Sequence, residues 1–177
     1  MSNISMTTSK RNAIVTVMLI SAFVSMLNQT ILNTALPAII KGLNITETTA
    51  QWLITGFMLV NGIMIPLTAF LMDKYSTRHL YIFSMAIFLI GSIVAAFSPT
   101  FTILMISRII QAIGAGILLP LMQFTVFTLF PAEQRGFAMG LAGVVVQSAP
   151  AIGPTLTGLF VDLFSWRMPF YLVSAIA

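Results

Sequence analysis

Long apolar runs separated by short polar breaks dominate this sequence of 177 residues. An apolar run of about 18 or more residues is typical of a membrane-spanning helix. No stretch alternates with the period of two that a transmembrane β-strand requires, which argues against a barrel. The pattern therefore predicts an all-α membrane protein whose sixth span is incomplete, with spans at about residues 12–37, 52–72, 80–97, 101–130, 136–163 and 168–177.

Polar segments mark the tail and the turns between these spans. Residues 1–11 are expected to form a polar tail, and residues 41–51 a longer polar loop. Charged turns are expected at 73–79 and 131–135, and 98–100 forms a tight uncharged link. A threonine in the longer loop is expected to cap the helix that follows it. The candidates for this cap are Thr46, Thr48 and Thr49.

Composition strengthens this interpretation and argues against several other classes of protein. Hydrophobic residues make up 58% of the chain and charged residues only 7%, whereas a soluble domain has about 25% charged residues. The basic residues lie at the ends of apolar runs rather than in a block, so we expect no nucleic-acid partner. The chain has no cysteine, which excludes disulfides and thiolate metal sites. No histidine pair, nucleophile–base constellation or phosphate loop is present, so we expect neither an enzyme nor a bound cofactor or metal.

The distribution of lysine and arginine predicts which helix ends face the cytoplasm. Cytoplasmic loops of membrane proteins carry an excess of these residues. With the N-terminus inside, the outer segments hold only Lys41 and Arg167, and Trp52 and Trp166 fall at the outer interface, where tryptophan is enriched. We therefore expect a multi-pass protein of the cell membrane with a cytoplasmic N-terminal tail. Its inner segments would hold Lys10, Arg11, Lys74, Arg78 and Arg135.

One charged residue, Arg108, interrupts an otherwise uncharged run from Phe101 to Phe130. Insertion scales put the cost of an arginine at mid-helix at about 2.5–3.5 kcal/mol. At about 1.5 Å per residue, Arg108 lies about 10 Å from the start of its span. Two interpretations are open: the side chain snorkels to the membrane surface, or it faces a water-filled pathway, as intramembrane charges usually do.

The number of spans also suggests a transporter architecture. Many secondary transporters are built from three-helix repeats, with the substrate near the bilayer midplane between them. A weak similarity between two parts of the sequence supports such repeats. Asn28 is followed nine residues later by Pro37, and Gln111 is followed nine residues later by Pro120. These pairs lie in the first and fourth spans, which would be the first helix of each repeat.

The turn "LMDKYSTRH" (71–79), between spans 2 and 3, is similar to the motif Gly-x-Leu-Ala-Asp-Arg-x-Gly-Arg-Lys of the major facilitator superfamily. Together with the motifs described below, which follow in the right order, it resembles the 14-helix drug/proton antiporter (multidrug efflux) branch of this family. Ala69, Ser76 and Thr77 depart from the family's Gly, Gly and Arg. The residues that match in kind are Leu71, Asp73, Lys74 and Arg78.

The fourth span carries a second match. The stretch "LMISRIIQAIG" (104–114) resembles the Arg-x-x-Gln-Gly-x-Gly motif, with Ala112 replacing a glycine. The matching residues are Arg108, Gln111 and Gly114. The resemblance implies that Arg108 takes part in proton coupling.

The first span resembles the branch's signature Leu-Asp-x-Thr-x-x-Asn-x-Ala-Leu-Pro in "LNQTILNTALP" (27–37). Thr30 and Asn33 match it, whereas Asn28 stands where the family has Asp. The four acidic residues of the chain all fall in predicted loops or at helix ends. A proton-binding carboxylate would therefore come from an absent half of the protein or from Asp162 reaching inward, unless coupling uses no protons or is absent.

The fifth span resembles the family's antiporter motif in "APAIGPTLTG" (149–158). The matching residues are Pro150, Gly153, Pro154 and Gly158. Further small residues at helical spacing, which allow close helix approach, are Gly136, Gly140 and Gly143. This span is either simply packed tightly, or its prolines let it bend to seal and open the outer side, as the motif implies. A short stretch, "WRMPFY" (166–171), is similar to the branch's Trp-Arg-x-x-Phe.

The resemblance implies a fold: the N-terminal six-helix bundle of a major facilitator superfamily protein, made of two three-helix repeats with a truncated sixth helix. Its implied function is the export of amphipathic drugs or toxic compounds by proton antiport with alternating access. The implied partners are the lipid bilayer, the substrate, protons and the missing C-terminal helix bundle. Residues in the coupling pathway would be Arg108, Gln111, Asn28, Asn33 and Thr30.

Three alternatives stay open beside this interpretation. The protein could transport a small metabolite, since the polar residues within its spans suit either kind of cargo. It could also be a truncated membrane protein that transports nothing. The turn with Asp73, Lys74 and Arg78 could be a simple solvated turn, whereas the resemblance implies a charge-paired latch in which Asp73 caps a helix end, binds basic groups in one conformer and releases them in the other.

Overall fold

The computed structural model describes residues 8–163 and 166–176, and these residues form six helices. Five of them are long and apolar enough to cross a membrane. The predicted all-α membrane architecture is therefore confirmed. The helices are α1 (Thr8–Leu43), α2 (Glu47–Lys74), α3 (Thr77–Ala96), α4 (Phe101–Leu129), α5 (Ala132–Leu163) and α6 (Met168–Ile176).

Several helices extend further than the apolar runs that predicted them. Residues 8–11 belong to α1 rather than to a tail, and α1 continues past Pro37 to Leu43. The expected loop at 41–51 shrinks to the three residues between α1 and α2. The reason is that an apolar run reports the thickness of the bilayer, whereas a helix also keeps its backbone hydrogen bonds where its polar ends are in water.

Side-chain caps fix where three of the helices begin. Thr46 caps α2 by accepting a hydrogen bond from the backbone N–H of Thr49 at 3.2 Å. Ser76 and Thr100 cap α3 and α4 in the same way. Thr46 is thus the cap among the three threonine candidates, and each of these caps satisfies one of the backbone donors that a helix start leaves free.

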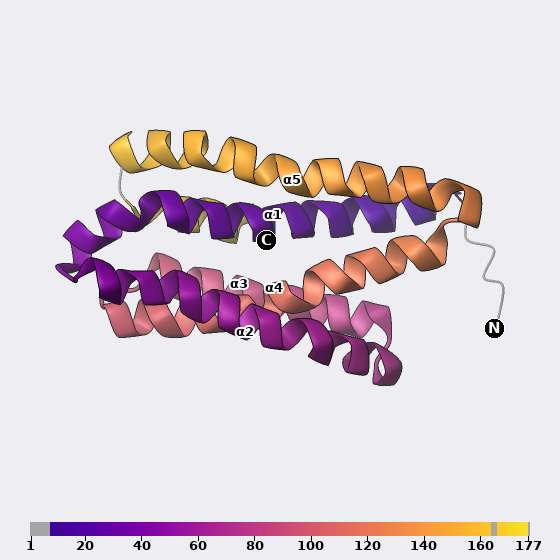
Figure 1. Cartoon of the computed structure of the whole chain (residues 1–177), viewed down its shortest axis with the longest axis horizontal. Coiled ribbons are helices and arrows are strands. Elements are labelled where there is room, and N and C mark those ends of the chain that lie inside the picture. Colours follow the sequence, from indigo (N-terminus) through magenta and orange to yellow (C-terminus); the bar gives the residue numbers. More distant parts are fainter. Residues whose placement is uncertain (1–7, 164–165, 177) are drawn as a thin grey trace.

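The helices form an elongated bundle in two groups. In Figure 1, α1 and α5 run side by side, and α2, α3 and α4 form the neighbouring group; α6 packs against α3 and α1. The start of α1, the α2–α3 turn and the α4–α5 turn all lie at one end of the bundle (Figure 1). The five basic residues that we expected on the inner side therefore share that end, which we call the basic end: Lys10, Arg11, Lys74, Arg78 and Arg135.

The most extensive helix contact joins α3 to α4. A Cβ atom at Gly114 would lie 2.5 Å from the carbonyl oxygen of Ser84, and one at Gly91 would lie 2.8 Å from the backbone nitrogen of Gln111. Each of these glycines therefore lets the two backbones approach more closely than any side chain would permit, as is common between membrane helices.

The two tryptophans differ in their surroundings. Trp52 is 55% exposed on the bundle surface, as expected of an interfacial residue. Trp166 is only 7% exposed, because its indole ring lies against Gly42 of α1 and meets the Phe170 ring edge-on at 6.4 Å. Trp166 is therefore not the exposed interfacial ring that we expected, and it instead packs the start of α6 onto the end of α1.

Candidate functional site: a buried polar network centred on α4

Arg108 is held inside the bundle, with 1% of its surface exposed. Its Nη1 donates a hydrogen bond to Oε1 of Gln111 at 2.7 Å. The guanidinium carbon lies 4.1 Å from the centre of the Phe57 ring on α2, in a cation–π contact. The side chain therefore does not extend to the membrane surface, and the snorkelling interpretation does not fit the structure.

Gln111 extends the network to a third helix, α3. Its Nε2 donates to Oγ of Ser92 on α3 at 2.9 Å, and Ser92 in turn donates to the carbonyl of Phe88 at 2.8 Å. Gly91 makes this link possible, because a Cβ at that position would lie 2.8 Å from both the backbone nitrogen and Cγ of Gln111. The chain Phe57, Arg108, Gln111 and Ser92 thus ties α2, α4 and α3 together.

The sequence did not reveal three members of this network: Phe57, Gly91 and Ser92. Phe57 is one of 14 phenylalanines, and nothing in its spacing distinguishes it from those that face outward. Ser92 follows Gly91 directly in "LIGSIV" (89–94). A glycine next to a serine in an apolar helix is a signal for a close helix contact with a hydrogen bond across it, and this signal could have located the α3 side of the network.

Polar atoms without partners adjoin the network. Asn28 is fully buried, and within the described part of the chain neither its Oδ1 nor its Nδ2 has a hydrogen-bond partner; the same holds for Nε of Arg108. The neighbours of Asn28 on α1, Leu27 and Ile31, share one apolar cluster with Phe57. Asn28 and Arg108 therefore border the same cluster without bonding to each other. A buried polar group left unsatisfied costs about 1–3 kcal/mol.

The other two expected pathway residues lie elsewhere on α1. Thr30 is half-buried, and its hydroxyl donates to the carbonyl of Met26 at 3.0 Å. Asn33 is exposed on the bundle surface. The structure thus brings Arg108 and Gln111 into direct contact, places Asn28 beside the apolar cluster that contains Phe57, and leaves Thr30 and Asn33 apart from the network.

In α5, one residue of the predicted motif makes a close helix contact. A Cβ at Gly153 would lie 2.8 Å from Cγ2 of Thr30, so this glycine sets the approach of α5 to α1. Pro150 and Pro154 are exposed, and the helix continues through both of them. A Cβ would meet nothing within 4 Å at four other glycines of α5: Gly136, Gly140, Gly143 and Gly158.

The expectation that Gly136, Gly140 and Gly143 allow close helix packing is therefore not met among the residues that the structure describes. A small residue permits close approach, but a partner helix has to lie on that side of it. The side chain of Asp162, the acidic residue closest to this motif, lies outside the described part of the structure.

The charged side chains of the turn between α2 and α3 do not pair with one another in this conformation, as far as the described residues show. Asp73 makes no hydrogen bond or ion pair with any residue that the structure describes, and Lys74 lies over the Phe70 ring at 4.4 Å. Ser76, rather than Asp73, caps α3, by accepting from the backbone N–H of His79 at 3.4 Å. The expectation that Asp73 caps a helix is therefore wrong. The charged groups of the turn are exposed.

Within the described residues, no group of three or more His, Cys, Asp or Glu side chains is placed to hold a metal ion. A bundle of membrane-length helices that buries a cation deep in its fourth helix defines a multi-pass membrane protein with an intramembrane polar site. Comparison with known proteins identifies its family. The model of the Major Facilitator Superfamily matches residues 18–177, and the chain belongs to this family of transporters, which are not enzymes.

Relatives with curated names include transporters and resistance proteins. The chain is 55% identical over 163 residues to the uncharacterized MFS-type transporter YcnB of Bacillus subtilis, covering 92% of the chain and 34% of that protein. It is 43% identical over 155 residues to the lincomycin resistance protein LmrB of B. subtilis, covering 88% and 32%. It is 35% identical over 151 residues to the probable multidrug resistance protein EmrY of Escherichia coli, covering 85% and 30%. The chain thus spans about a third of the length of these relatives.

A solved structure confirms the fold. It is that of a bacterial homologue of the human lysosomal transporter Spinster, in an inward-facing and unoccupied conformation. The TM-score is 0.76 with 16% sequence identity, and the match covers 96% of this chain and 41% of the other. The predicted six-helix arrangement of this family is therefore present.

Proposed function

We propose that the chain is the N-terminal bundle of a secondary active transporter that exports amphipathic drugs by proton antiport with alternating access. The observation that carries this proposal is the burial of Arg108, which is held by Gln111 and Phe57 instead of reaching toward the surface. Intramembrane charges are expensive and usually serve transport or relay functions. The names of the relatives LmrB and EmrY support drugs as the cargo.

In this proposal Arg108 supplies a fixed positive charge and Asn28 supplies an uncharged amide that can donate and accept hydrogen bonds. Glu47, Asp73 and Glu133 lie at helix ends, away from the buried network. The carboxylate that exchanges the proton would therefore be Asp162 reaching inward or a residue of a second, C-terminal helix bundle. Arg108 would attract that carboxylate in one conformation and release it once the carboxylate is protonated.

The test of this proposal is proton-driven dye efflux by the complete gene product carrying Arg108→Ala. The variant should insert into the membrane normally, because removing a buried charge eases insertion. It should, however, lose the uncoupler-sensitive efflux that the native protein shows. Lys41→Ala, which removes an exposed cation at a helix end, is the matched control and should transport normally. Near-normal efflux by Arg108→Ala at equal expression would contradict the proposal.

We also propose that the basic end of the bundle, with the turn of Asp73, Lys74 and Arg78, faces the cytoplasm, in line with the excess of basic residues there. Because the chain has no cysteine, single cysteines can be introduced without background. Ser76→Cys should resist a membrane-impermeant maleimide in intact cells, and Thr48→Cys at the opposite end should react. Labelling with the reverse pattern would refute this orientation.

The same turn and α5 carry the conformational part of the proposal. The exposed charges of the turn would pair in the other conformer of the cycle and release in this one. The α5 motif, Pro150, Gly153, Pro154 and Gly158, would provide the bending point of the outer gate. Gly153, which lies against Thr30 of α1, would hold α5 to α1 at this bending point.

A further inference from the structure

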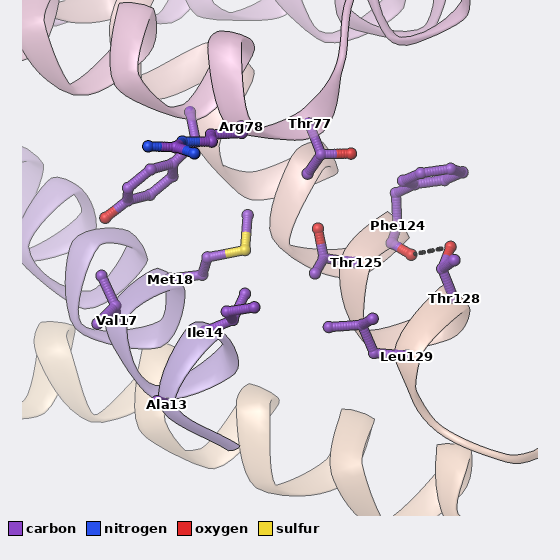
Figure 2. Close-up of a pocket in the computed structure, with 11 residues that line it drawn as sticks. Ala13, Ile14, Val17, Met18, Thr77, Arg78, Phe124, Thr125, Thr128 and Leu129 are labelled. Carbon is purple, nitrogen blue, oxygen red and sulfur yellow. Dashed lines mark hydrogen bonds between the residues drawn. The ribbon is translucent and has the colours of Figure 1, made fainter. Parts of the chain in front are cut away.

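A cavity of about 610 Å³ lies between α1, α3 and α4 at the basic end of the bundle. Figure 2 shows its walls: Ile14 and Met18 of α1 face Thr125 and Leu129 of α4, and Arg78 lies at the start of α3 above them. The volume falls within the range of about 300–1,000 Å³ that is typical of sites for drug-sized ligands. The cavity is therefore large enough for a small organic molecule.

The hydrogen-bonding groups of the cavity are mostly used within the protein. The hydroxyls of Thr125 and Thr128 donate to carbonyls of their own helix at 2.7 and 2.9 Å, and Tyr81 shares a hydrogen bond with Ser21. Arg78 differs from them, because it is the only charged residue of the lining and makes no hydrogen bond or ion pair with the part of the chain that is described. Its guanidinium offers five N–H donors in a planar fork that suits an acidic group.

We propose that this cavity binds a small acidic amphiphile, a drug-sized carboxylate or sulfonate. Its acidic group lies on the guanidinium of Arg78, and its apolar body lies against Ile14, Val17 and Met18 of α1 and against Leu129 of α4. The charge of the lining excludes a lipophilic cation as the favoured ligand. The apolar walls disfavour a fully polar anion, since such an ion would lose its hydration and gain only Arg78 as a partner.

This site is distinct from the buried network. Arg108 and Phe124 are 16 residues apart on α4, which is about 24 Å at 1.5 Å per residue. Binding to the cavity is an equilibrium property of this chain, and it requires neither proton coupling nor transport. The inference therefore goes beyond the export proposal and is tested separately from it.

The test compares two fluorescent probes that share one ring system, the anionic dansylglycine and the neutral dansylamide. Each is titrated against the purified chain in nanodiscs of phosphatidylcholine, whose zwitterionic headgroups do not compete as anions. Dansylglycine should bind about two- to fivefold more tightly than dansylamide, the range expected of an ion pair with an exposed arginine. Arg78→Gln should reduce this ratio to about one without changing the affinity for dansylamide.

Two further variants place the site. Lys10→Gln removes an exposed cation from the same end, three residues before the lining begins at Ala13, and should leave the ratio unchanged. Thr128→Trp adds bulk at an exposed position of the lining and should weaken both probes. The proposal is overturned if neither probe binds, if the two bind equally to the native chain, if Arg78→Gln keeps the ratio, or if Thr128→Trp leaves both affinities intact.

Discussion

Substituting Gly114 by alanine should push α3 and α4 apart locally and destabilise the bundle. A Cβ at this position would lie 2.5 Å from the carbonyl oxygen of Ser84 and 2.9 Å from the backbone nitrogen of Phe88, whereas an ordinary contact begins at 3.4 Å. The two helices must therefore move apart locally by about 0.9 Å, since both obstacles are backbone atoms that no rotamer change can displace. Overpacking of this kind costs about 1–3 kcal/mol.

A second substitution isolates that cost from the higher helix propensity of alanine. Alanine gains about 0.8–1.0 kcal/mol over glycine in a helix, and this gain applies to both sites. At Gly140, in the middle of α5, a Cβ would meet nothing within 4 Å, so Gly140→Ala reports the propensity gain alone. The difference in unfolding free energy between the two variants should therefore be about 1–3 kcal/mol, with Gly114→Ala the less stable.

The assay is reversible unfolding of the purified chain in mixed micelles of mild detergent and dodecyl sulfate, followed by circular dichroism. Gly114→Ala should unfold at a lower fraction of dodecyl sulfate than Gly140→Ala. If Gly114→Ala were as stable as Gly140→Ala, the close approach of α3 and α4 would carry no energetic weight, and the reasoning from this contact would be wrong.

Three further changes test other contacts of the bundle in the same unfolding assay or in dye efflux. Phe57→Leu should destabilise the chain by about 0.5–2 kcal/mol beyond its packing loss, because Arg108 loses its cation–π partner; an equal effect in an Arg108→Leu background would show that the contact contributes nothing. Asn28→Leu should stabilise the chain by about 1–3 kcal/mol, since it removes a buried amide without partners, and a loss of stability would mean that the amide is satisfied. Asn28→Asp in the complete gene product should raise the efflux of a cationic dye relative to a neutral one, and an unchanged ratio would separate Asn28 from the pathway.

The number and order of the helices could be predicted from the sequence because the bilayer sets a minimum length for each apolar run. Arg108 could be singled out for a similar reason, since a full charge inside such a run is rare. The ends of the helices were less accessible. Residues 8–11 and the segment around Leu43 are polar enough to resemble loops, yet they continue α1, because a helix needs only satisfied backbone bonds and not an apolar composition.

The partner of Arg108 on another helix, Phe57, could not be predicted, because lipid and protein interior are equally apolar. In a water-soluble bundle, an apolar stripe shows which face of each helix turns inward. Here Phe57 is 1% exposed and Phe127 is 50% exposed, although both stand in continuous apolar runs. The rotation of each helix, and with it the contact of Phe57 with Arg108, depends on small residues such as Gly91 and Gly114 that let backbones meet.

The polar groups at the centre of the bundle lower its stability. Arg108 uses one nitrogen on Gln111 and one face on Phe57, yet its Nε and the whole amide of Asn28 lack partners among the residues described. A chain selected only for a stable bundle would place leucine at both sites, because each unsatisfied group costs about 1–3 kcal/mol. The two residues therefore make sense as groups whose partners arrive during function, so Asn28→Leu should gain stability and lose efflux together. A variant that gained stability and kept normal efflux would show that the amide has no role in transport.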